Sequence, residues 1–152
     1  MTDRRRKILV VDDDRSLTEL LEMVLEDAGY TVALAENGRD AIVSAAKDPP
    51  DLVVLDVVMP EMDGWATSDH LLSHERTAKI PIIFLSARVG AEDQLRGWYR
   101  GCFDYLTKPF DIQELLEKVS QALADPSEAV EQLKLDLRQQ RIAALEQIVE
   151  AE

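Results

Sequence analysis

Polar side chains stand at the points where four short apolar runs of this chain end. In chain order they are Asp12, Asp13 and Asp14 together, then Asp56, Ser86 and Lys108. If the runs are parallel strands, their carboxyl ends meet at one edge of the sheet. We therefore expect these side chains to share one crevice.

Several carboxylates in one crevice repel one another and shift each other's pKa values unless a cation joins them. Mg²⁺ is a natural partner because it prefers a few carboxylates together with waters and a phosphoryl oxygen. One aspartate could then attack phosphorus, with Lys108 and Ser86 each contacting a phosphoryl oxygen. A single aspartate after a strand is more often a helix cap, which is the role we expect for Asp14.

Apolar runs and amphipathic segments alternate five times along the chain. The predicted strands cover 8–11, 32–34, 52–55, 80–85 and 103–107. The predicted helices cover 17–25, 41–46, 65–74, 91–99 and 111–123. Short, continuous apolar runs suit strands that are buried on both faces of a sheet. The alternation predicts an α/β fold with a doubly wound, five-stranded parallel sheet and right-handed crossovers.

A further helix is predicted after this domain. Asp125, Pro126 and Glu128 have the residue types of an N-cap, an N1 and an N3 position. We expect a basic, flexible leader at 1–6, a domain at 7–124 and this additional helix at 125–152. The helix could form a homodimer through residues 126–150 as a short coiled coil, or pack on its own domain, or serve as a linker; the sequence leaves these alternatives open.

Composition narrows the class of protein. The 152 residues are 46% hydrophobic and 31% charged, as in globular domains, and the net charge of −13 argues against direct nucleic-acid binding. The one cysteine, Cys102, excludes a disulfide framework and is expected to be buried. No apolar run approaches ~18 residues, so we expect no contact with a membrane and a cytoplasmic location.

The motifs resemble the receiver domain of two-component response regulators. The stretches that carry the resemblance are KILVVDDD at 7–14, DLVVLDVVMPEMDG at 51–64, IPIIFLSA at 80–87 and GCFDYLTKPF at 101–110. The resemblance covers roughly residues 6–124. It implies a flavodoxin-like sheet with strand order 2-1-3-4-5.

The resemblance also implies a role for each matching residue. Asp56 would be the phosphoacceptor and Lys108 the lysine that contacts the phosphoryl group. Ser86 and Tyr105 would be the switch pair, with the ring of Tyr105 turning inward on phosphorylation. The Mg²⁺ ligands would be Asp12, Asp13, Asp56 and the backbone carbonyl of Val58. The peptide bond between Lys108 and Pro109 would be cis.

Such a domain is a signalling module rather than an enzyme, and it catalyses its own phosphorylation. Its partners would be a histidine kinase or phosphotransfer protein and a downstream protein or missing output domain. Val58 and Arg88 flank the site at positions where polar residues can orient an attacking water. With these two residues at those positions, we expect slow self-dephosphorylation. Two alternatives are a haloacid-dehalogenase-like phosphohydrolase that uses Asp12 as nucleophile, and a docking module that is never phosphorylated.

Overall fold

The structure is a computed structural model that describes residues 5–124 and 127–151. Five strands form one parallel sheet: β1 (Lys7–Val11), β2 (Thr31–Ala35), β3 (Leu52–Asp56), β4 (Ile82–Ser86) and β5 (Asp104–Thr107). The helices are α1 (Arg15–Asp27), α2 (Gly38–Lys47), α3 (Gly64–Ser73), α4 (Ala91–Tyr99), α5 (Ile112–Leu123) and α6 (Glu128–Ala151). The strand order β2-β1-β3-β4-β5 confirms the predicted doubly wound fold with its additional C-terminal helix.

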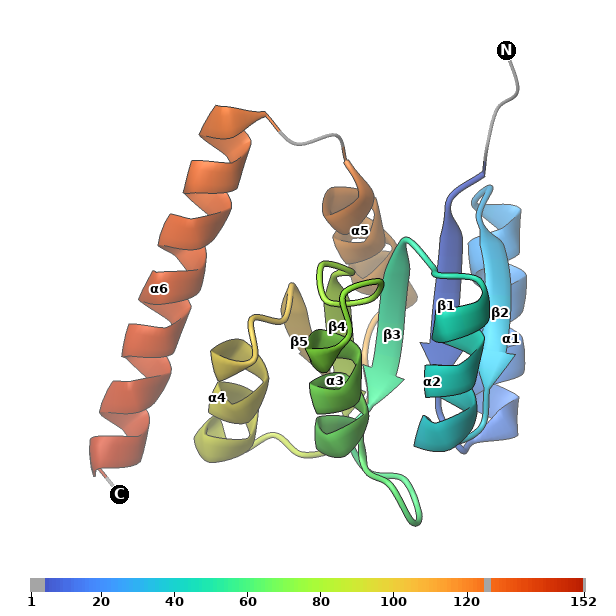
Figure 1. Ribbon diagram of the computed structural model, residues 1–152. Coiled ribbons are helices and arrows are strands. Elements are labelled where there is room, and N and C mark those ends of the chain that lie inside the picture. The colour runs from blue at the N-terminus through green and yellow to red at the C-terminus, as the bar shows by residue number, and fades with distance from the viewer. Residues whose placement is uncertain (1–4, 125–126, 152) are drawn as a thin grey trace.

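Helices cover both faces of the sheet (Figure 1). One face packs against α1 and α5 through a cluster that includes Leu21, Leu25 and Leu115, all fully buried. The other face packs against α2, α3 and α4 through a cluster that includes Ala45 and Phe84. Because both faces are covered, β1, β3 and β4 are apolar almost throughout.

The ends of the helices carry the residue types that cap helices in other proteins. Asp14 caps α1, and its carboxylate accepts hydrogen bonds from the backbone N–H groups of Ser16 and Leu17, as expected. Asp111 caps α5 in the same way. Gly29 follows α1 with a φ of 102°, the left-handed conformation that glycine adopts most readily.

Helix α6 begins differently from its prediction. The expected cap Asp125 and the following Pro126 lie outside the described residues. The described helix starts at Glu128, and the hydroxyl of Ser127 accepts a hydrogen bond of 3.3 Å from the backbone N–H of Val130. Ser127 is therefore the cap that the structure shows.

The predicted basic leader lies partly outside the described residues, which begin at residue 5. Within the described part, the guanidinium of Arg6 lies 3.9 Å from the carboxylate of Asp51. The backbone carbonyl of Arg6 also accepts a hydrogen bond from the N–H of Thr31. The last residue of the leader is thus held against the sheet, and the domain boundaries at 7 and 124 stay predictions.

Candidate functional site

The sheet register brings two buried carboxylates together at the carboxyl edge. Val11 pairs with Leu55, so that Asp12 and Asp56, the next residue of each segment, come side by side. Both are buried, at 2% and 5% exposure, whereas Asp13 is exposed. Each of the three aspartates offers an oxygen within 4.8 Å of the others. The predicted acidic crevice is therefore present in the geometry.

Lys108 supplies the countercharge in this crevice. Its ammonium donates a hydrogen bond of 2.7 Å to Asp12 and lies 3.5 Å from a carboxylate oxygen of Asp56. Partial burial acts to lower the pKa of Lys108, but the two carboxylates outweigh burial and the net shift is upward. The backbone N–H of Lys108 donates to the carbonyl of Ser86, and the peptide bond to Pro109 is cis, as the resemblance implied.

Asp56 has a strongly perturbed carboxyl group. Burial, and next the nearby charge of Asp12, raise its pKa to about 6. Lys108 and the backbone N–H of Val58, which donates to Asp56 over 3.3 Å, oppose this rise. Negative charge on Asp56 is thus costly in this structure, and a cation bound beside it would make ionisation easier.

The loop after β3 depends on a glycine. The N–H of Gly64 donates a hydrogen bond of 2.8 Å to the carbonyl of Val57. A Cβ at Gly64 would lie 2.2 Å from the backbone oxygen of Asp56, so no larger residue fits beside this strand end. Val58 is half exposed next to Asp56 and presents an apolar side chain to the opening of the crevice.

The donor set fits a hard divalent cation. Asp12, Asp13 and Asp56 offer carboxylate oxygens, the ligand type that Mg²⁺ prefers. Within the described part of the chain, this is the group of acidic side chains that converges closely enough to hold an ion. The exposure of Asp13 leaves one side of the site open to water and to a second ligand.

Ser86 and Tyr105 are connected through one backbone residue. The buried hydroxyl of Ser86 accepts a hydrogen bond of 3.0 Å from the N–H of Arg88. The hydroxyl of Tyr105 donates a hydrogen bond of 2.8 Å to the carbonyl of the same residue. Arg88, which the sequence singled out only in connection with dephosphorylation, is therefore the link between the two predicted switch residues.

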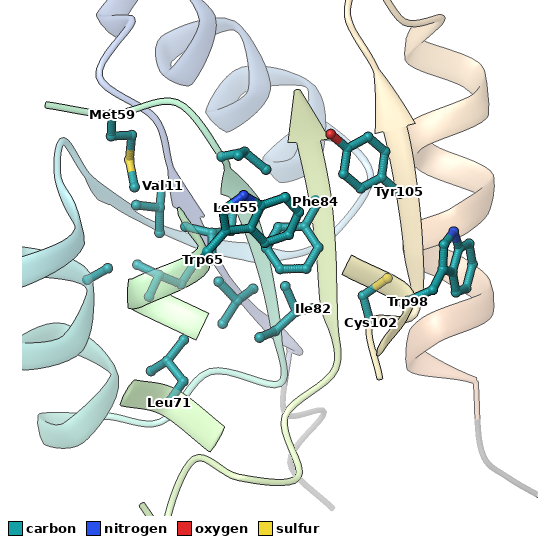
Figure 2. Packing of buried hydrophobic residues seen from close by; sticks show 14 of the residues in the cluster. Val11, Leu55, Met59, Trp65, Leu71, Ile82, Phe84, Trp98, Cys102 and Tyr105 are labelled. Atoms are coloured by element: carbon teal, nitrogen blue, oxygen red, sulfur yellow. The ribbon is translucent and has the colours of Figure 1, made fainter. Parts of the chain in front are cut away.

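The ring of Tyr105 already lies inside the protein. It is 4% exposed, and its centroid lies 6.2 Å from that of Phe84 and 6.3 Å from that of Trp65 (Figure 2). The resemblance implied an inward turn of this ring on phosphorylation. In this arrangement a change of the hydroxyl's partner, rather than a swing in from solvent, is the movement that remains for Tyr105.

Two further buried groups lie outside the crevice. Burial raises the pKa of the Cys102 thiol well above its usual range, which fits the predicted inert role. Asp104 in β5 is 6% exposed and lies 3.1 Å from the ammonium of Lys118. The sequence did not predict this ion pair, because Asp104 lies on β5 and Lys118 lies on α5.

Residues 8–120 match the sequence profile of the response regulator receiver domain. The match spans most of the chain and every element of the sheet. This chain therefore belongs to the response regulator receiver domain family.

Relatives with described roles agree with this family. The DNA-binding dual master transcriptional regulator RpaA of Synechocystis is 41% identical over 113 residues, which are 74% of this chain and 47% of that protein. The transcriptional regulatory protein HprR of Escherichia coli is 41% identical over 114 residues, which are 74% of this chain and 49% of that protein. The chain thus spans about half the length of these relatives.

Solved structures show the same fold. A putative response regulator from Chloroflexus aurantiacus superposes with a TM-score of 0.76 at 37% identity, covering 80% of this chain and 100% of that one. The chemotaxis protein CheY4 of Vibrio cholerae superposes with a TM-score of 0.75 at 32% identity, covering 79% of this chain and 100% of that one.

These comparisons revise two expectations. The family assignment overturns the phosphohydrolase alternative, in which Asp12 would be the nucleophile. The expectation that no nucleic acid is involved lacks support, because one relative is described as DNA-binding. Across the described residues, no helix has the length and apolar character needed to cross a membrane. The cytoplasmic location stays a prediction.

Proposed function

We propose that Asp56 accepts a phosphoryl group from a histidine kinase or phosphotransfer protein, and that the product is a signal rather than a catalytic intermediate. One observation supports this most strongly: Asp12, Asp56 and Lys108 converge within hydrogen-bonding or ion-pair distance at the carboxyl edge of the sheet. A carboxylate oxygen of Asp56 would attack phosphorus as the bond to the donor histidine breaks. Lys108 would move from carboxylate to phosphoryl oxygen.

Mg²⁺ is the cofactor that this site would hold. Asp12, Asp13 and Asp56 would bind it through carboxylate oxygens and Val58 through its backbone carbonyl. The ion would neutralise charge on the phosphoryl oxygens during transfer. Val58 has an apolar side chain, and the guanidinium of Arg88 lies 3.8 Å from the carboxylate of Asp93, so we propose slow self-dephosphorylation.

The switch would run through Ser86 and Tyr105. The Ser86 hydroxyl, which accepts a hydrogen bond from the N–H of Arg88, would turn toward Asp56 to donate a hydrogen bond to a phosphoryl oxygen. The Arg88 carbonyl, which holds the Tyr105 hydroxyl, would move with it. We propose that the surface of α4, β5 and α5 changes as a result, as a shift between two populated arrangements.

We also propose which partners bind this surface. A downstream protein or an output domain in a longer chain would bind the changed surface, since the matched region makes up only about half the length of the relatives named above. A homodimer through residues 126–150 remains a second possibility, supported by Leu133 and Leu137, which are more than half exposed on α6. Light scattering tests this homodimer. The mass of a monomer, both with and without a phosphoryl mimic, would exclude it.

Intact mass tests the phosphorylation directly. The protein is incubated with acetyl phosphate and Mg²⁺, alongside Asp56→Asn and a sample with the metal chelated. We expect one added phosphoryl group in the wild type and none in either control. Absence of the added mass with acetyl phosphate and with a phosphorylated histidine kinase, in a folded protein, would favour the docking module that is never phosphorylated.

A further inference from the structure

Helix α6 is seated on α4 of its own domain. Leu145 is 7% exposed within the same apolar cluster as Trp98, and Ile142 packs against that cluster. The guanidinium of Arg141 lies 5.7 Å from the centroid of the Trp98 ring. The hydroxyl of Tyr99 donates a hydrogen bond of 2.6 Å to Glu146. An apolar stripe and a flanking carboxylate of α6 thus cover the last turn of α4.

The covered surface is connected to the acidic crevice. Arg88, which holds both Ser86 and Tyr105 through its backbone, also reaches into α4, where its guanidinium lies 3.8 Å from the carboxylate of Asp93. Further along α4, a Cβ at Gly97 would lie 3.1 Å from the Tyr105 ring, so helix and ring are in close contact. These contacts would carry a movement of this loop to α4.

The seating of α6 on the domain is incomplete. In its N-terminal half, the ammonium of Lys134 lies 5.4 Å from the centroid of the Phe103 ring and donates a hydrogen bond of 3.5 Å to the carbonyl of Gln121. A cavity of about 420 Å³, lined by Lys134 and Arg138 among others, also lies along this half of the helix, which is seen beside α4 in Figure 1. The buried indole N–H of Trp98 has no hydrogen-bond partner among the described residues. A buried donor without a partner is unfavourable, and water could satisfy it once α6 moves away.

We propose that α6 occupies the α4 surface in the unphosphorylated chain and that phosphorylation of Asp56 releases its C-terminal half. This inference rests on the proposed function. The released surface would fit an amphipathic helix of the same chemistry as α6, with an apolar stripe next to a carboxylate. Because equilibrium coupling between two sites is reciprocal, loosening α6 must stabilise the phosphorylated state as much as phosphorylation loosens α6.

Matched variants on α6 test this coupling in the full-length chain. Leu145→Glu places a charge against Trp98, whereas Leu137→Glu places the same charge on a position that is 55% exposed. Phosphorylation from acetyl phosphate with Mg²⁺ is followed by intact mass. We expect Leu145→Glu to be phosphorylated about fivefold faster or more, because the arrangement with α6 released is the one that accepts the phosphoryl group and becomes more populated, and Leu137→Glu to behave as the wild type. Tyr99→Phe, which removes only the hydroxyl bonded to Glu146, should give a smaller increase in the same direction.

Hydrogen exchange of α6 provides the reciprocal measurement. Amides in residues 141–149 should exchange faster in the phosphorylated wild type than in Asp56→Asn under the same conditions. Equal phosphorylation rates in all variants, with α6 exchange unchanged by phosphorylation, would overturn the coupling while leaving the proposed function intact. No phosphorylation of any variant would overturn both.

Discussion

The acidic crevice and the contact between α4 and α6 bury groups of opposite character. In the crevice, Asp12 and Asp56 are almost completely buried as carboxylates, and Lys108 compensates them only in part. At the helix contact, Leu145 and Trp98 bury mainly apolar surface, and the one direct hydrogen bond lies at the exposed rim. The crevice thus holds charge that a ligand can stabilise, whereas the contact is held by a modest apolar area that can separate.

The largest effect should come from removing the cation of the crevice. Lys108→Ala should lower the rate of phosphorylation by about 100-fold or more. The variant lacks the ammonium group that would stabilise the negative charge developing on the phosphoryl oxygens. Lys79→Ala, at an exposed lysine, is the control. Time courses of intact mass with acetyl phosphate measure both. An unchanged rate in Lys108→Ala would show that this lysine is only a structural ion-pair partner.

The burial of charge at Asp56 should also change the free energy of unfolding. Asp56→Asn should stabilise the fold in Mg²⁺-free buffer at pH 7.5, by up to about 3 kcal/mol, because the pKa of Asp56 is raised to about 6 in the folded state. In an unfolded chain it titrates near 4. The wild type therefore loses stability as pH rises from about 4 to 6, and the advantage of the variant should disappear below about pH 4.

Urea denaturation across this pH range provides the measurement. The difference in the free energy of unfolding between Asp56→Asn and the wild type should be small at pH 4 and reach its plateau above pH 6. A difference that is independent of pH would contradict the electrostatic explanation. Added Mg²⁺ should narrow the difference, because only the wild type gains from an ion beside Asp56.

Substitutions at Asp13 and Asp14 should distinguish ion binding from helix capping. Asp13→Asn should weaken Mg²⁺ binding by about tenfold or more, since it removes one charged oxygen ligand of a site that has few. Asp14→Asn removes the same charge one residue further on and preserves the α1 cap, since asparagine caps as well as aspartate. Calorimetric titration should therefore distinguish them, and equal weakening by both would indicate a general charge effect.

The smallest effect should come from the helix contact. Leu145→Ala should cost about 1 kcal/mol in global stability, below the 2–5 kcal/mol typical of a core leucine such as Leu115, because Leu145 lies on a helix that can separate from α4 while the sheet stays folded. Leu137→Ala, at an exposed position of the same helix, should stay within about 0.5 kcal/mol. Thermal unfolding measures all three. A cost at Leu145 equal to that at Leu115 would mean that α6 is an integral part of the core.

The sequence predicted the crevice well because strand ends are local properties, while the strand order was implied by the family resemblance. Asp56 and Ser86 end apolar runs, and parallel strands carry such ends to one edge. Side-chain contacts across elements were not predictable in this way. The bond of the Tyr105 hydroxyl to Arg88 and the seating of α6 on Trp98 depend on how helices pack, which apolar periodicity alone does not specify.

Helix α3 shows the same limit from another side. Its sequence is polar for a helix that packs on the sheet, yet Thr67 and Ser68 are fully buried. Their hydroxyls return to carbonyls of their own helix, to Asp63 over 2.8 Å and to Trp65 over 3.1 Å. A polar residue that satisfies its own hydroxyl in this way can pack like an apolar one, and composition alone does not reveal it.

The most direct test of the central claim is to locate the phosphoryl group on the chain. The protein is treated with acetyl phosphate and Mg²⁺, the acyl phosphate is reduced with borohydride, and the resulting homoserine is located by peptide mass spectrometry. We predict homoserine at position 56 alone, dependent on both phosphoryl donor and metal. Homoserine at position 12 or 13, with position 56 unchanged, would contradict the assignment of Asp56 as the acceptor.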